Sequence, residues 1–234
     1  MAKKKDQPVT IQTAAKLLTD AAHFRYDLSE LFRDFVSITA ISLQNGFEPK
    51  SEAWEAREAE YHEIVKGYDR EVIDAFASCM GAIMLIAQRD GYGDQLGTLY
   101  MALGTGKKGL GQFFTPYHIS QAMAAMAMNK DMVEQAIAEK GYIAVGEPTC
   151  GAGGMVVAAA EAITNLGYRH QDVMRCDAQD LDRVCCRMTY IACCLHQIPA
   201  RIIWGDTLKM EQRTIDLTPA LWLQMARMRL QEAA

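Results

Sequence analysis

The residues best suited to binding a small ligand lie in two short stretches, residues 112–116 and residues 147–155. The second stretch, residues 147–155, contains three glycines in four positions, Gly151, Gly153 and Gly154. It follows the apolar, partly β-branched run 142–145, which is typical of a buried parallel strand, and it precedes an alanine- and valine-rich run that predicts a helix. A strand, a glycine-rich turn and a helix form a nucleotide-binding unit, because glycine lets the backbone approach a ligand closely. Glycine-rich turns also follow strands in α/β proteins that bind nothing there, so a purely structural turn stays an alternative.

The first stretch carries Gln-Phe-Phe-Thr-Pro at residues 112–116. With Glu-Pro-Thr-Cys-Gly-Ala-Gly-Gly at residues 147–154, it resembles the N6-adenine DNA methyltransferase family, whose motifs are Gln-(Phe/Tyr)-(Phe/Tyr)-Thr-Pro and Asp-Pro-(Ala/Thr)-Cys-Gly-(Ser/Thr)-Gly-Gly. The modification subunits of type I restriction systems and their short phage and prophage relatives are the most similar members. The segment Asp94-x-x-Gly97-x-x-Tyr100 resembles a further element of these subunits, although Met101 replaces their glutamate.

This resemblance implies S-adenosylmethionine as the cofactor. Glu147 stands where the family has aspartate, and Ala152 stands where it has serine or threonine, so one hydroxyl contact is lost. The first stretch would close over the methionine end of the cofactor, with Thr115 as a polar contact and Phe114 as a packing wall; an alternative is that Phe113 and Phe114 are simple core aromatics. The cofactor-binding residues predicted in the two stretches are Gln112, Phe113, Phe114, Thr115, Pro116, Glu147, Thr149, Gly151, Ala152, Gly153 and Gly154.

Two acids are predicted to complete the cofactor site. By resemblance Asp180 is the best candidate for binding the ribose hydroxyls, with Asp177 and Asp182 as alternatives, since carboxylates also cap helices. Asp206 matches the acid of a Gly-Asp-(Ser/Thr)-Leu element that contacts the cofactor adenine in the family. It could equally be a turn residue.

The family holds the exocyclic amine of a flipped adenine with Asn/Asp-Pro-Pro-Phe/Tyr. The sequence contains no such tetrapeptide. The nearest string spans residues 216–222, so Asp216 and Pro219 are only weak catalytic candidates and the catalytic residues stay unknown. Two main hypotheses follow. The protein is a DNA methyltransferase that modifies adenine N6, or it is a catalytically inactive relative that binds S-adenosylmethionine or has a regulatory role. A third is methylation of another substrate.

Two further patterns predict no ligand site. Cys185, Cys186, Cys193 and Cys194 lie in a predicted helix, where adjacent residues diverge by about 100°, so they are expected to be core residues and no metal is expected. The GxGxxG string at residues 104–109 follows no strand, so a hinge is favoured over a dinucleotide fingerprint.

The expected fold is α/β. Residues 1–102 read as a helical N-terminal region, with a serine cap at Ser51 and a strong apolar helix at 72–88. Residues 103–234 read as a Rossmann-like S-adenosylmethionine-dependent methyltransferase core, short at its C-terminal end. Its expected elements are a helix at 118–128, strands at 142–145, 172–177 and 201–204, and a helix at 181–196. In the first helix Ile119, Met123 and Met126 share one face, and Met123, Met126 and Met128 are expected to fill the core. Strands that alternate with helices predict a parallel sheet with right-handed crossovers.

The composition agrees with a globular protein. The 234 residues carry a net charge of −5, which argues against wrapping DNA by bulk electrostatics but leaves room for a local basic surface that binds DNA. The resemblance implies that a separate specificity subunit recognises the DNA target. Seven cysteines without disulfide spacing, the lack of a secretory signal and the lack of an apolar run near twenty residues favour a cytoplasmic protein without a membrane span.

Overall fold

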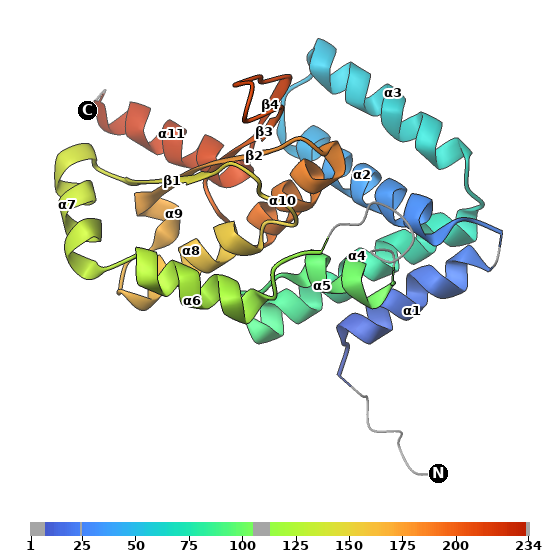
Figure 1. The fold of residues 1–234 in the computed structure, drawn as a ribbon. Helices are drawn as coiled ribbons and strands as arrows, with labels where there is room; N and C mark the ends of the chain where they lie inside the picture. Colours follow the sequence, from blue (N-terminus) through green and yellow to red (C-terminus); the bar gives the residue numbers. More distant parts are fainter. Residues whose placement is uncertain (1–7, 24, 105–112, 233–234) are drawn as a thin grey trace, which may run out of the picture.

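The strands of the protein form one mixed sheet in a computed structural model that describes residues 8–23, 25–104 and 113–232 (Figure 1). Strands β1 (Ile143–Glu147), β2 (Met174–Asp180) and β3 (Ala200–Trp204) are parallel neighbours in that order. Strand β4 (Thr214–Leu217) pairs antiparallel with β3. The predicted α/β fold is confirmed, but a wholly parallel sheet is wrong at β4. The reason is the short connection 205–213, because a parallel neighbour needs a crossover of about a dozen residues or more.

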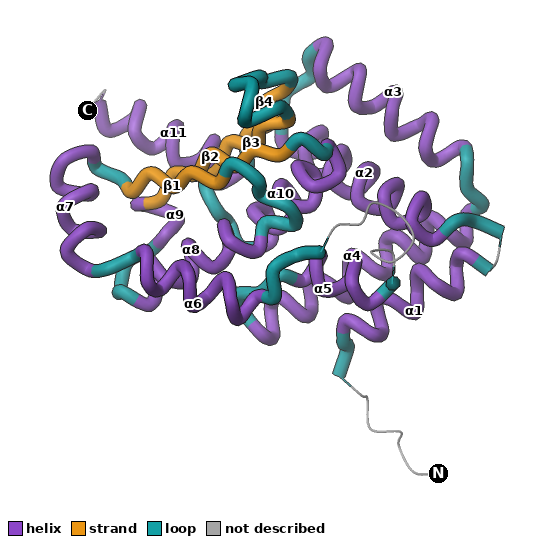
Figure 2. The backbone as a smooth tube through the Cα atoms, in the orientation of Figure 1, coloured by secondary structure: helices purple, strands orange, loops and turns teal. Residues whose placement is uncertain are grey.

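Helices surround this sheet, and those before residue 103 form the predicted helical N-terminal region (Figure 2). Each begins at a residue suited to it; for example, the Ser51 hydroxyl accepts a hydrogen bond from the Trp54 N–H at 3.2 Å, as expected of a helix cap. Buried side chains of these helices and of the α/β part belong to one hydrophobic cluster, so the domain division at residue 102 stays a prediction. The five helices are α1 (Ile11–Ala22), α2 (Leu28–Phe47), α3 (Glu52–Lys66), α4 (Arg70–Asp90) and α5 (Gln95–Ala102).

The remaining helices pack on both faces of the sheet. Met174 and Cys176 of β2 are buried on one face, toward α8 and α10, whereas Arg175 points to the other face and donates a hydrogen bond to Gln224 of α11 at 3.0 Å. Helix α11 covers this second face only in part, since Ala144 of β1 is exposed. The helices are α6 (Tyr117–Ala127), α7 (Lys130–Lys140), α8 (Gly154–Asn165), α9 (His170–Val173), α10 (Arg183–Leu195) and α11 (Pro219–Glu232).

Helix α6 turns its methionines outward, contrary to the sequence prediction. Met123 and Met126 are 52% and 85% exposed, and Ile119 is exposed as well. The buried residues of α6 are the small Ser120 and Ala124, because α6 packs closely against the alanine-rich α8. The placement of Met123 and Met126 in the core is therefore wrong, whereas Met128 is partly buried and packs against the core.

Helix α4 changes the expectation about apolar length. Among the described residues it is the one helix long and apolar enough to cross a membrane by length and composition, with a mean hydropathy of 1.5 over its most apolar window. The expectation that no run reaches this length is therefore wrong. About a third (33%) of that window is buried inside the protein, and one such helix is weak evidence for a span, since core helices pass the same test.

Candidate functional site

A cavity of about 290 Å³ lies where β1 and β2 end, and residues of both sequence motifs line it. The carboxyl ends of parallel strands are the usual place for a ligand in an α/β sheet. Larger cavities, of about 870 and 960 Å³, lie among the N-terminal helices and α10 and contain no residue of these motifs. The smaller cavity is lined by Asp94, Phe113, Phe114, Thr115, Ser120, Thr149, Cys150, Gly151, Ala152, Gly154, Met155, Asp180 and Cys185.

The glycine-rich turn after β1 forms one wall and needs its glycines. Gly151 and Gly153 have φ of +54° and +90°, a backbone conformation that other residues rarely adopt. A Cβ on Gly153 would lie 3.2 Å from the backbone of Thr189, so this glycine also lets the turn approach α10. The Thr189 hydroxyl donates a hydrogen bond to the carbonyl of Gly151 at 3.0 Å, and the Cys150 N–H donates one to the carbonyl of Gln179 at 2.8 Å. The turn is therefore fixed before any ligand binds.

Of the three acids considered for the ribose, Asp180 is the one that lines the cavity. Its two carboxylate oxygens accept hydrogen bonds from the Gly151 and Asp182 N–H groups, each at 2.9 Å. Since a carboxylate oxygen can accept two bonds, each keeps acceptor capacity for a ligand hydroxyl. Asp182 instead caps α10 through the Val184 N–H, and Asp177 forms an ion pair with Arg201 at 2.8 Å.

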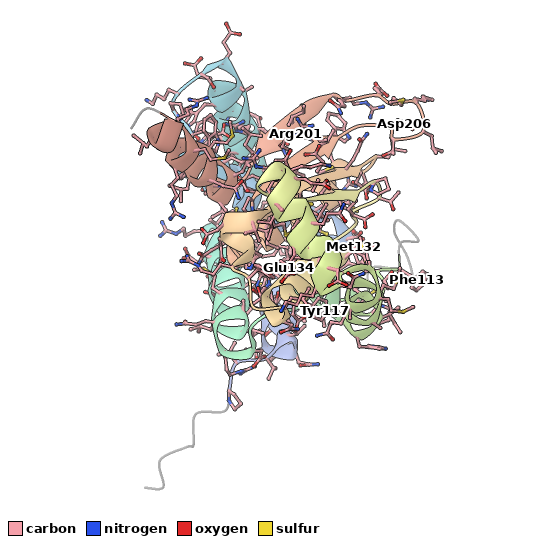
Figure 3. The ribbon with its side chains drawn as sticks, turned by 90° about the vertical axis from the view of Figure 1, so that its left-hand side faces the viewer. Phe113, Tyr117, Met132, Glu134, Arg201 and Asp206 are labelled. Carbon is pink, nitrogen blue, oxygen red and sulfur yellow. The ribbon has the colours of Figure 1, made fainter. Side chains whose placement is uncertain are left out.

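The loop before α6 forms the opposite wall. A Cβ on Gly151 would lie 3.1 Å from the Phe114 ring, which also meets Tyr100 edge-on at 5.1 Å, so Phe114 packs over the glycine turn. Phe113 lines the mouth of the cavity and is 71% exposed, so it is not a core aromatic (Figure 3). Thr115 lines the cavity, whereas Pro116 caps α6. Gln112, and residues 105–109 of the predicted hinge, lie outside the described residues.

Some predicted cofactor residues lie next to the cavity rather than in its wall. The Glu147 carboxylate accepts a hydrogen bond from the Thr149 N–H at 3.1 Å and so shapes the turn. Asp206 lies on the loop after β3, on the same side of the molecule as Phe113 (Figure 3). Its carboxylate accepts bonds from the N–H groups of Leu208 and Lys209, and the Lys209 bond in particular holds the pKa of Asp206 below its usual value. These hydrogen bonds are the geometry expected if Asp206 is a turn residue, which is the alternative prediction for it.

The structure does not bring the two weak catalytic candidates to the cavity. Asp216 lies in β4, where burial raises the pKa of its carboxyl and Arg57 and Glu48 of the N-terminal helices are its charged neighbours. Pro219 is the first residue of α11, a position that suits proline because no helical N–H is needed there. Pro219 therefore has a structural explanation, whereas Asp216 lies in β4 and is not among the residues that line the cavity.

A comparison with known protein families covers the part of the chain that forms this cavity. A model of the N-6 DNA methylase family matches residues 88–224, more than half of the chain. The chain belongs to this family. The match includes both motifs and all of the elements that line the cavity.

Two solved structures are similar to this N-6 DNA methylase family member at low identity. One is the methyltransferase subunit of a type I restriction-modification system from Streptococcus thermophilus, with 13% identity and a TM-score of 0.43, covering 87% of this chain and 59% of that subunit. The other is a putative class I S-adenosylmethionine-dependent methyltransferase from Listeria monocytogenes, with 12% identity and a TM-score of 0.40, covering 93% of this chain and 69% of that protein. The chain thus spans less than two thirds of the Streptococcus subunit. No curated protein matches the chain.

Sequence reasoning assigned no role to two of the buried polar residues in the cavity of this methylase family member. Asp94, which caps α5, is 7% exposed, and burial raises the pKa of its carboxyl to about 6 despite a bond from the Gly97 N–H. Ser120 of α6 is fully buried, and its hydroxyl has no hydrogen-bond partner within residues 8–23, 25–104 and 113–232. The only sequence signal was the Asp94-x-x-Gly97 resemblance.

The cysteines near the cavity are buried thiols. The Cys186 thiol donates to the Ile203 carbonyl at 3.4 Å, and a hydrogen bond with Cys150 and burial raise its pKa. Cys185 and Cys193 are buried too, and Cys194 is half-buried. Within residues 8–23, 25–104 and 113–232, no three His, Cys, Asp or Glu side chains gather closely enough to hold a metal ion.

Proposed function

We propose that this member of the N-6 DNA methylase family binds S-adenosylmethionine in the cavity at the ends of β1 and β2. The observation that carries the proposal is that residues of the Phe-Phe-Thr-Pro loop, the glycine-rich turn and the acid at the end of β2 line one cavity. A nucleoside cofactor with an amino-acid part needs an open backbone turn, an acceptor for its ribose hydroxyls and an apolar wall. The cavity offers these three in Gly151, Asp180 and Phe114.

The polar groups of the cavity also fit such a ligand. The Ser120 hydroxyl is buried without a partner in the described part of the chain, and Asp94 is a buried carboxylate, so the cavity contains polar atoms that a ligand would satisfy. Glu147, Thr149, Ala152, Gly153 and Gly154 would shape the turn around the amino-acid part. Gln112 and Thr115 would contribute from the loop, and Asp206 would face the adenine.

We further propose that the methyl acceptor is adenine N6 in DNA. When bound, the cofactor would supply an electrophilic methyl group. The N6–C bond would form as the sulfonium S–C bond breaks, S-adenosylhomocysteine would leave, and the amine proton would pass to solvent. A DNA partner fits the family, and the resemblance to type I modification subunits suggests a separate specificity subunit. The net charge of −5 argues against wrapping DNA by bulk electrostatics. In this proposal the protein works in the cytoplasm and away from membranes.

One observation favours a second function, cofactor binding without methyl transfer. The sequence has no Asn-Pro-Pro-aromatic tetrapeptide, and Asp216 and Pro219 lie away from the cavity. No residue that lines the cavity is positioned by a known motif to hold the adenine amine. A regulatory S-adenosylmethionine-binding protein would have the same cavity.

Calorimetric titration and a labelled-transfer assay separate these proposals. We expect S-adenosylmethionine to bind the folded protein and Gly151→Val to abolish binding, because valine is strained at φ +54° and meets the Phe114 ring. Incubation with methyl-labelled cofactor and DNA should place label on adenine. Cofactor binding without label in DNA, RNA or protein would support the non-catalytic function, and absence of cofactor binding by the wild-type protein would reject both.

A further inference from the structure

The Asp94 carboxylate is buried, and within the described part of the chain one of its two oxygens accepts a hydrogen bond. Its Oδ1 accepts from the Gly97 N–H at 2.8 Å, which caps α5. Its Oδ2 faces the start of α8, since a Cβ on Gly154 would lie 3.4 Å from it. No donor in the described part of the chain bonds Oδ2. An ionised carboxylate that is buried with so little compensation favours a cationic partner.

The segment that carries Asp94 is held in place from several sides. The Tyr92 hydroxyl bonds His170 Nδ1 at 3.0 Å, and Gln95 Oε1 bonds His196 Nε2 at 3.1 Å. A Cβ on Gly97 would lie 2.1 Å from Asp94 Oδ2, so glycine is needed where the carboxylate folds over the helix start. The carboxylate is therefore pre-positioned, as a binding group is expected to be.

Ser120 supplies an independent second observation. It lies on α6, which is a different element from the one that carries Asp94, and both residues line the same cavity. Its side chain is 0% exposed, and its hydroxyl oxygen has no hydrogen-bond partner among the residues that the structure describes. Two acceptors from different elements thus line one cavity that is also lined by the glycine-rich turn.

The chemistry of these two groups identifies the kind of ligand atom that they would bind. A hard metal ion would need about six oxygen ligands, and no acidic or metal-ligating cluster exists among the described residues. An ammonium group instead has three N–H donors and one positive charge, which matches one carboxylate and one hydroxyl. S-adenosylmethionine has such an ammonium on its amino-acid part.

We propose that Asp94 binds the α-ammonium group of the cofactor and that the Ser120 hydroxyl accepts a second hydrogen bond from it. This inference rests on the proposed binding of S-adenosylmethionine in this cavity. It assigns to Asp94 the discrimination between a cofactor with an amino-acid part and a nucleoside without one.

Titration of wild type and Asp94→Asn with three ligands tests the assignment. S-adenosylmethionine and S-adenosylhomocysteine carry the ammonium, and 5′-methylthioadenosine lacks the amino-acid part. We expect Asp94→Asn to weaken the first two at least tenfold and to leave the third unchanged. Asparagine keeps the cap of α5, because its side-chain oxygen also accepts from the Gly97 N–H. Ser120→Ala should weaken the first two ligands several-fold.

The matched control is Asp27→Asn, since Asp27 caps α2 and is exposed, away from the cavity. It should change the affinity for none of the ligands. A second readout needs no ligand: Asp94→Asn should raise the thermal midpoint of the free protein at pH 7.5, because it removes a buried charge. A purely structural aspartate would give a lower midpoint on substitution.

The outcomes distinguish this inference from the proposed function. If Asp94→Asn binds S-adenosylmethionine as tightly as wild type, the assignment of Asp94 is overturned while cofactor binding stands. If all three ligands weaken equally, the effect is on the whole cavity and the assignment is again overturned. If wild type binds none of the ligands, both proposals fail.

Discussion

Three aspartates near the end of β2 have the same side chain but different contacts, so the same substitution should have three different results. Asp180→Asn loses an acceptor for one of two backbone N–H groups and one ribose acceptor; we expect at least tenfold weaker cofactor binding and about 1–2 kcal/mol less stability. Asp177→Asn breaks an exposed ion pair with Arg201, which contributes about 0–1 kcal/mol, and should leave binding unchanged. Asp182→Asn preserves a helix cap and should be nearly neutral. Titration and urea unfolding of the three variants check this; equal affinity of Asp180→Asn and Asp177→Asn would contradict the role of Asp180.

At this scale the sequence predicts the residues whose function depends on local backbone geometry. Gly151 and Phe114 lie in contiguous motifs, so their contact can be anticipated from the motif pair. Asp94 and Ser120 could not be given a role, because their significance is burial without a full set of partners. That property arises only when α5, α6 and α8 pack together. The exposure of Met126 also depends on tertiary packing, because the apolar pattern of α6 does not show which of its faces packs against α8.

At the scale of elements, a buried polar network joins the segment between α4 and α5 to α8, α9 and α10. It runs from Tyr92 through Thr164 and His170 to the carbonyl of His196, and the His196 ring bonds Gln95. Burial lowers the pKa of both histidines. Since their folded-state pKa values lie below the ordinary 6.5, the unfolded chain binds more protons as pH falls below 6.5, and stability should decrease in that range.

Asp94 opposes this trend, which makes the pH dependence testable. Its folded-state pKa of about 6 lies above the ordinary 3.8, so the folded protein binds the extra proton and is stabilised as pH falls through 6. We therefore expect the free energy of unfolding to fall more steeply between pH 7.5 and 5.5 in Asp94→Asn than in wild type. Urea unfolding at several pH values measures this. Parallel curves for the two proteins would show that Asp94 does not titrate in this window.

The same scale shows why some elements were predictable. Strands β1 and β3 and helix α10 are apolar runs between turn residues, and the predicted ranges agree with them within about two residues. The predicted second strand, 172–177, begins two residues before β2, because residues 172–173 belong to α9. It also ends three residues too soon, because Asp177 and Asp180 hide the strand pattern at the end of β2. Strand β4 was not predicted, because its order depends on pairing with β3 rather than on its own four residues.

At the scale of the molecule, helix α3 is attached both by the partly buried Tyr61, Ile64 and Val65, which pack against the core, and by polar contacts. It has no buried residue and lies at the periphery of the structure (Figure 1). Its Glu60 carboxylate accepts hydrogen bonds from Arg187 at 2.7 Å and Arg183 at 3.1 Å, both on α10, beside the 870 Å³ cavity that α2, α3 and α10 enclose. Because α10 also packs on the glycine-rich turn, these ion pairs connect the outermost helix to the wall of the candidate site.

Glu60→Gln tests how much this connection stabilises the protein. Burial raises the pKa of Glu60, but hydrogen bonds and charge from Arg187 and Arg183 outweigh it and hold the pKa below the ordinary 4.5. The ion pairs should therefore stabilise the protein above about pH 4.5, with loss as pH falls through the lower folded-state pKa. Because Arg187 is buried and Glu60 is partly exposed, we expect Glu60→Gln to lower the free energy of unfolding by about 1–3 kcal/mol at pH 7, as measured by urea unfolding.

The control Glu55→Gln changes an exposed residue of the same helix, and its free energy of unfolding should stay within about 0.5 kcal/mol of wild type. Equal stability of the two variants at pH 7 would mean that α3 is held by its remaining contacts with α2, and a difference that persists well below the Glu60 pKa would show that charge is not its cause.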